Sequence, residues 1–94
     1  MDSGSIKNLA FNLKQKYSNL FLVLGSEQEG KATITICIGD DLLKSKGLHA
    51  GNIVREVAKE IQGGGGGQPG FATAGGKNPE GIEKAIKKAL SFLN

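Results

Sequence analysis

The residues with the most distinctive chemistry lie in one glycine-rich segment, 62–76, which reads QGGGGGQPGFATAGG. Glycine occupies eight of the fourteen positions from 63 to 76, and none of the fourteen residues is charged. Successive backbone N–H groups without side chains can converge on a phosphate or another anion. Lys77 and a helix start at Asn78–Pro79 follow directly, and both would add positive potential. The segment is therefore a candidate anion-binding site.

The glycines of this segment are also compatible with two purely structural roles. Glycine can serve turns with positive φ and close backbone packing, or it can form a flexible linker. A linker rarely contains apolar residues such as Pro69 and Phe71. A mononucleotide-binding P-loop is excluded, because Asn78 stands where that motif needs a hydroxyl after its lysine.

The other reactive side chains of the chain are few. His49 and Cys37 are its single histidine and cysteine, which excludes a disulfide framework, a multi-histidine metal site and a cysteine-rich zinc site. We expect His49 to start a helix and Cys37 to act as a small, partly buried residue. Aromatic residues do not alternate with basic ones, which argues against stacking on single-stranded nucleic acid as the main mode of binding.

Length and composition restrict the class of protein. The 94 residues predict one domain, and no apolar run approaches the roughly 20 residues that cross a membrane. The charged fraction of 22% is typical of a globular chain. A net charge of +3 permits an anionic partner. The start, Met1–Gly4, has no secretory signal pattern, so we expect a cytoplasmic protein.

The first part of the chain predicts a helix and a β-hairpin. Apolar residues recur at helical spacing over 5–17. Residues 31–38 alternate between threonines and isoleucines, which predicts a strand with one buried face and with Cys37 on the threonine face. Together with the apolar run 20–25 and a polar connection at 26–30, this pattern predicts a hairpin over 20–38. Residues 40–47 predict one helical turn that ends at Gly47.

The second part predicts two further helices around the glycine-rich loop 62–76. Residues 49–61 have an apolar stripe and a charged face, and Gly63 follows where a left-handed cap would stand. Asn78–Pro79 predicts the start of a last helix over 79–92. The fold class is therefore α+β. About three helices pack on a small sheet, formed by the hairpin and, as an option, a third short strand at 71–74.

From Leu48 onward the sequence is similar to a known family. LHAGNIVREVA leads into GGGGGQP and then FATAGG, an order of motifs that resembles the C-terminal domain of bacterial alanyl-tRNA synthetase. That domain is related to the accessory domain of one class of phosphoesterases. The distinctive match covers 48–76, and the predicted elements on both sides also fit, so that the resemblance covers nearly the whole chain.

The resemblance implies a non-catalytic domain that helps to hold the outer corner of tRNA for aminoacylation and editing. The implied partners are tRNA, above all tRNA(Ala), and the upstream domains of the parent synthetase, with a homodimer as an option. It implies no cofactor for this part and ATP, magnesium and zinc for the parent alanine–tRNA ligase. Residues 1–4 are expected to be a tail, in part left from cloning, and residues 5–94 a single domain.

The resemblance also implies which residues bind RNA. The family usually carries basic residues at the positions of Gly65 and Gln68, and an acidic one at Gly70. Their absence here leaves backbone N–H groups and nearby side chains as the expected contacts. These are Gly63, Gly64, Gly65, Gly66, Gly67, Gln68, Gly75, Gly76, Lys77, His49, Asn52, Lys84 and Lys88.

Two alternative functions belong to other classes. The chain could be the accessory substrate-binding domain of a phosphoesterase, whose metal site would then lie in another domain. It could instead be primarily a dimerisation module in which helix 5–17 pairs with its copy. The Ala-Gly pair at 50–51 and the closing Gly-Gly pair at 75–76 favour the synthetase domain over the phosphoesterase domain.

Overall fold

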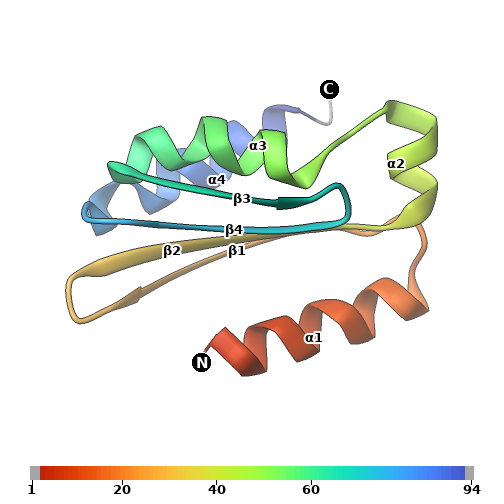
Figure 1. Ribbon diagram of the computed structural model, residues 1–94, viewed down its shortest axis with the longest axis horizontal. Coiled ribbons are helices and arrows are strands. Elements are labelled where there is room, and N and C mark those ends of the chain that lie inside the picture. The colour runs from red at the N-terminus through yellow and green to blue at the C-terminus, as the bar shows by residue number, and fades with distance from the viewer. Residues whose placement is uncertain (1–2, 93–94) are drawn as a thin grey trace.

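The computed structural model describes residues 3–92, with the side chains of 8–27 and 29–92 (Figure 1). The α-helices are α1 (Ser3–Lys16), α2 (Asp40–Lys46), α3 (Ala50–Val57) and α4 (Ile82–Ser91). The strands are β1 (Phe21–Gln28), β2 (Lys31–Ile38), β3 (Gly63–Gln68) and β4 (Phe71–Gly76), and two 3-10 helices, η1 (Ala58–Ile61) and η2 (Pro79–Gly81), complete the order.

The four strands form one antiparallel sheet in the order β1-β2-β4-β3. Two hairpins, β1–β2 and β3–β4, therefore meet along β2 and β4. The α+β class is confirmed, with one helix more than expected because Asp40–Lys46 forms a helix of its own. The third strand at 71–74 is confirmed as part of β4.

The predicted loop 62–76 is wrong, because both halves of the glycine-rich segment are strands. Gly63–Gln68 pairs with Phe71–Gly76 over six residue pairs, and only Pro69–Gly70 connects them. Glycine discourages strands by entropy and by its lack of a side chain. The paired strand β4 and the overlying helix α3 outweigh that preference here.

The β1–β2 hairpin is confirmed, but the expectation of a single buried face in 31–38 is wrong, because Thr35 and Cys37 on the other face of β2 are buried as well. The three isoleucines Ile34, Ile36 and Ile38 are fully buried. The hairpin turns through two residues, Glu29 and Gly30, with φ of 53° and 78°. Positive φ at both positions is the property of the type I′ turn that fits the twist of a hairpin. The expected connection at 26–30 is thus shorter, since the strand continues to Gln28.

Two helices cover the isoleucine face of the sheet. In Figure 1 α3 and α4 lie together on one side, α3 over β3 and β4 and α4 over β1. The apolar stripe of α3 is buried against the sheet, as its helical spacing predicted. The core residues of the two helices and η1 are Ala50, Ile53, Val54, Val57, Ala58, Ile61, Ala85 and Ala89.

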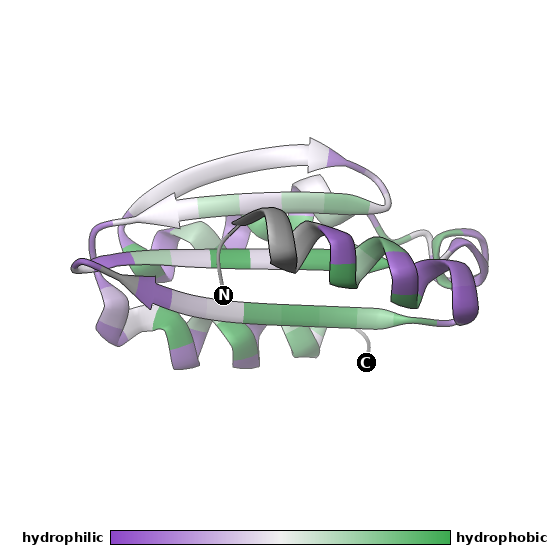
Figure 2. Ribbon diagram, turned by 90° about the horizontal axis from the view of Figure 1, so that it is seen from below, coloured by the Kyte–Doolittle hydropathy of each residue, from purple (hydrophilic) through white to green (hydrophobic). Residues whose placement is uncertain are grey.

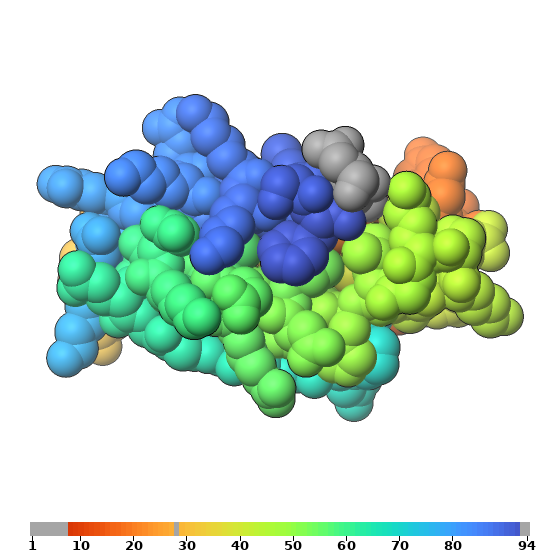
Figure 3. All heavy atoms as spheres, turned by 90° about the horizontal axis from the view of Figure 1, so that it is seen from above, coloured from red at the N-terminus to blue at the C-terminus, as the bar shows by residue number. Residues whose placement is uncertain are grey.

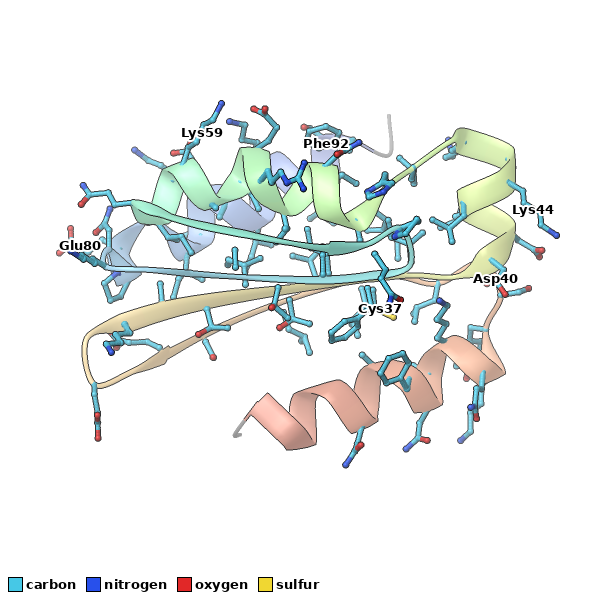
Figure 4. The ribbon with its side chains drawn as sticks, viewed as in Figure 1. Cys37, Asp40, Lys44, Lys59, Glu80 and Phe92 are labelled. Atoms are coloured by element: carbon cyan, nitrogen blue, oxygen red, sulfur yellow. The ribbon has the colours of Figure 1, made fainter. Side chains whose placement is uncertain are left out.

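The opposite face carries α1, which makes the molecule three layers deep where this helix lies (Figures 1 and 2). Ala10 of α1 is fully buried, and its carbonyl oxygen accepts a hydrogen bond from the Cys37 thiol at 3.6 Å. Figure 4 shows Cys37 between the sheet and α1. Its place on the threonine face is confirmed, although the thiol is fully rather than partly buried.

Several predicted boundaries move by a few residues. Ser3 and Gly4, expected in a tail, begin α1, which ends at Lys16; residues 1–2 lie outside the described part. Helix 49–61 is α3 followed by η1, and its left-handed cap is Gln62 (φ 55°) rather than Gly63. Helix 79–92 starts as the 3-10 helix η2, and α4 ends at Ser91.

Candidate functional site

The five consecutive glycines form the edge of the sheet. Among the described residues 3–92, β3 has β4 on one side and no strand on the other. In an antiparallel edge strand every second residue directs its N–H and C=O groups away from the sheet. The residues from Gly63 to Gly67 have no side chains of their own to cover these groups. The structure therefore presents the glycine run as an extended backbone surface rather than as a looped cradle.

Alternate glycines of β3 have different steric surroundings. A Cβ added at Gly63, Gly65 or Gly67 would lie within 2.7 Å of a Cα atom of β4. A Cβ at Gly64 would meet nothing within 4 Å, and one at Gly66 would meet only the Arg55 side chain. Packing against β4 thus requires glycine at 63, 65 and 67, whereas nothing in the fold requires it at 64 or 66.

Backbone angles and close contacts together show which structural role the glycines of this segment serve. No residue from 63 to 76 has positive φ, so turn conformations do not account for them. Close backbone packing accounts for alternate residues of β3. A flexible linker is wrong, because the segment forms two paired strands with only the turn Pro69–Gly70 between them.

The start of α3 lies against the turn of the glycine hairpin. The backbone N–H of Ala50 donates to the carbonyl oxygen of Pro69 at 2.8 Å. His49 caps the helix, and its Nδ1 accepts a hydrogen bond from the Asn52 backbone N–H at 3.2 Å. The predicted helix-start role of His49 is confirmed. His49 and Asn52 are thereby placed at the end of α3 that borders the hairpin turn.

The helix start expected at Asn78 is less available to an anion. The Asn78 side chain does not cap the following helix. Its Nδ2 donates to the Glu60 carbonyl oxygen at 3.4 Å, and its backbone N–H donates to the Ile61 carbonyl oxygen at 3.0 Å. Asn78 thus ties η2 to η1, and the helix that follows at this point is only a 3-10 turn.

The predicted lysines do not all lie beside the glycine strand. Lys77 follows β4 directly and is exposed. Lys84 and Lys88 lie on α4, and Figure 3 shows α3 between α4 and the strand β3. The Lys88 ammonium lies 3.8 Å from Glu60 Oε1 and donates to the Glu56 carbonyl oxygen at 3.4 Å. The structure therefore groups Lys77 with β3 and β4 and leaves Lys84 and Lys88 on another surface.

Arg55 lies beside the glycine strand, and the sequence pattern did not predict this position. Its guanidinium nitrogens lie 3.6 and 3.7 Å from the position that a Cβ of Gly66 would take. The side chain forms no ion pair with any residue from 8 to 27 or 29 to 92. In the sequence Arg55 belongs to the charged face of an ordinary amphipathic helix. Only the packing of α3 over β3 places it here.

A hollow of about 260 Å³ lies on the other side of the glycine hairpin, between β3, β4 and α1. Phe11 of α1 and Phe71 of β4 stack beside it, with ring centroids 5.1 Å apart and planes inclined by 20°. The residues that line it are Phe11, Gly66, Gly67, Gln68, Phe71, Ala72 and Thr73. The two aromatic residues are sixty positions apart, so no local pattern could have paired them.

The described side chains show no metal centre. No group of three or more His, Cys, Asp or Glu residues among them is arranged to hold a metal ion. Burial raises the pKa of the Cys37 thiol, and the nearby Lys14 ammonium partly opposes that shift. Within residues 3–92 no helix combines the length and apolar character needed to cross a membrane.

Comparison with known proteins gives consistent matches along the chain. The family profile described as the DHHA1 domain matches residues 1–94. The alanine–tRNA ligase of Christiangramia forsetii is 55% identical over 93 residues, which are 99% of this chain and 11% of that protein. The ligase of one Bacteroides fragilis strain is 52% identical over 93 residues, with coverages of 98% and 11%. The chain thus spans about a ninth of the length of these curated relatives.

A solved structure supports the same relation at the level of the fold. The crystal structure of the C-Ala domain from Aquifex aeolicus alanyl-tRNA synthetase superposes with a TM-score of 0.87 and 28% sequence identity. The match covers 99% of this chain and 82% of that chain. The similarity therefore extends over the whole described sheet and its helices.

Proposed function

Because this chain belongs to the DHHA1 domain family, we propose that it is the non-catalytic tRNA-binding domain at the C-terminal end of an alanine–tRNA ligase. The ligases that it resembles along 98–99% of its length support the parent enzyme. The C-Ala fold supports the place of the domain in that enzyme. The accessory domain of a phosphoesterase is the weaker alternative, because these relatives are ligases.

The observation that carries the RNA-binding role is the glycine edge, which has no side chains of its own and has cations beside it. The outward N–H groups of β3 can donate to phosphate oxygens without a side chain in between. Arg55 lies against Gly66, and Lys77 follows Gly76. Contacts of this kind position a nucleic acid without reading its sequence. The proposed site consists of β3, the ends of α3 and β4, Arg55 and Lys77, and it leaves out Lys84 and Lys88.

In this proposal the outer corner of tRNA lies at the glycine edge, and the natural RNA partner is tRNA(Ala). The remaining domains of the ligase are joined to this domain in one polypeptide. A soluble, cytoplasmic setting follows from this role. ATP, magnesium and zinc belong to the parent enzyme in the proposal. In the proposal the domain itself contributes binding and orientation only.

A titration of the chain with purified tRNA(Ala), an unrelated tRNA and an RNA duplex at two salt concentrations tests the proposal. We expect salt-sensitive binding to both tRNAs and weaker binding to the duplex. Each phosphate contact contributes roughly 0.7–0.9 to the slope of log K against log salt. Arg55→Ala and Lys77→Ala should each reduce the magnitude of that slope by the contribution of about one phosphate contact.

Lys84→Ala is the matched control, because it removes the same charge from α4. It should leave the slope nearly unchanged. Equal losses for Lys77→Ala and Lys84→Ala would mean that the protein binds RNA only through its net charge. No binding of the intact chain to either tRNA would contradict the proposed function of the isolated domain.

Dimerisation is the other alternative function, and light scattering tests it directly. α1 buries Ala10 against the sheet and stacks Phe11 on Phe71. Part of the apolar side of this helix is therefore used within the chain, and Phe11 stays 39% exposed.

A further inference from the structure

We propose that the hollow between α1 and the β3–β4 hairpin binds one unstacked nucleobase of the RNA. This inference rests on the proposed RNA-binding function and adds a base-binding pocket to its backbone contacts. The hollow is lined by Phe11 of α1 and by residues of both strands of the hairpin, so the pocket would add an aromatic contact that the glycine N–H groups do not supply.

The shape of the hollow suits a single flat ring. Its volume of about 260 Å³ is below the roughly 300–1,000 Å³ of pockets for drug-sized ligands. Phe11 remains 39% exposed, although it stacks on Phe71 at 5.1 Å. Aromatic rings that border such a space are the usual platform for a base that has left its stack.

The polar groups around the hollow suit the edge of a base. Gln68 supplies an amide and Thr73 a hydroxyl, and both side chains are exposed. Gly66 and Gly67 supply backbone without side chains, so that a ring can approach the strand closely. Amide and hydroxyl groups can donate to or accept from any of the four bases, which predicts binding with little sequence preference.

Two cationic side chains that lie against the glycine hairpin favour a nucleotide over an uncharged aromatic ligand. Arg55 lies against Gly66, which also lines the hollow. The Lys14 ammonium lies against Gly70 in the hairpin turn and 3.8 Å from Asp40 Oδ1. The phosphates next to an inserted base would therefore meet Arg55, which has no ion pair among the described side chains.

The first test compares Phe11→Leu with Phe92→Leu, a matched control at another exposed phenylalanine, at the end of α4. Stacking on an aromatic side chain contributes enough that its loss should weaken tRNA binding roughly 5-fold or more. Phe11→Leu should leave duplex binding unchanged, and Phe92→Leu should change neither. Equal affinity of Phe11→Leu and the intact chain for tRNA would overturn the proposal.

The second test separates this inference from the proposed function by using small ligands. Amide NMR spectra of the intact chain are recorded with adenosine 5′-monophosphate and with ribose 5-phosphate, which lacks the base. We expect shifts at Gly66, Gly67, Gln68 and Thr73 with the first ligand only, and their loss in Phe11→Leu. These shifts without any tRNA binding would retain the pocket and reject the tRNA-binding role. No shifts, or equal shifts with both ligands, would reject the pocket.

Discussion

The two hairpins of the sheet hold their strands in different ways. In β1–β2 the isoleucines of β2 are buried under α3 and α4, and the two-residue turn has the backbone angles that a hairpin favours. In β3–β4 the edge strand has no side chain from Gly63 to Gly67, and its glycines approach the backbone of β4 closely. The first hairpin depends on side-chain burial and the second on the absence of side chains.

The difference shows how one sheet can combine a buried, stabilising region with an edge whose backbone is accessible. Buried β-branched residues supply the apolar area that stabilises the fold. A glycine edge adds little apolar burial, but it leaves backbone donors accessible. The paired positions Ile36 and Ala72 illustrate the change from large to small residues across the sheet.

The largest effect should come from the core of the first hairpin. Ile36→Ala removes a fully buried side chain and should lower the free energy of unfolding by about 2–5 kcal/mol. Ala72→Gly, at the paired position of β4, should cost only about 0.5–1 kcal/mol. Urea denaturation of both variants measures the difference, and similar losses would contradict the division between the two hairpins.

The next effect should separate neighbouring glycines of β3. In Gly65→Ala the new methyl group would lie 2.5 Å from the Ala74 Cα, so overpacking should cost about 1–3 kcal/mol. Gly64→Ala points its methyl group into open space and should change stability by no more than about 0.5 kcal/mol. Thermal unfolding of the pair is the measurement. A reversed order would mean that β3 is paired in another register.

Substitutions in the turn of the first hairpin should have smaller effects on stability, and the two substitutions should act in opposite directions. Gly30→Ala places a Cβ at φ 78° and should destabilise by about 1–2 kcal/mol. Glu29→Asn should raise stability, because asparagine tolerates the φ of 53° found at this position. The two midpoints in urea should move in opposite directions, and a shift of both in one direction would argue against the type I′ turn.

The smallest effect should be the pH dependence contributed by Cys37. Burial raises the pKa of its thiol above the ordinary value, so the folded state disfavours the thiolate. Its contribution to stability is complete below the unfolded-state pKa of about 8.5 and is lost as the pH rises above it. The intact chain should therefore lose stability relative to Cys37→Ala between about pH 7.5 and about pH 9.5. Residues 63–76 carry no titratable side chain, so no such effect can arise there.

A parallel course of the two pH curves would contradict the burial of the thiol. The two proteins differ only at position 37, so the difference between their curves reports on Cys37 and its surroundings. Urea denaturation at the two pH values is sufficient for this measurement.

Local patterns in the sequence determined the elements whose side chains have a period. The alternation in 31–38 predicted the buried isoleucine face of β2, and the apolar stripe of 49–61 predicted the packing of α3 and η1. The motifs from Leu48 to Gly76 predicted the family. These predictions succeeded because burial of side chains at regular spacing selects one secondary structure and one orientation.

The tertiary structure alone decided the form of the glycine-rich segment and its neighbours. Five glycines have no side-chain period, so their strand exists only because β4 and α3 lie beside it. The same packing places Arg55 at Gly66, leaves Lys84 on another surface and stacks Phe11 on Phe71. Contacts between residues far apart in the chain depend on how the sheet and helices assemble, and no local spacing of residue types encodes them.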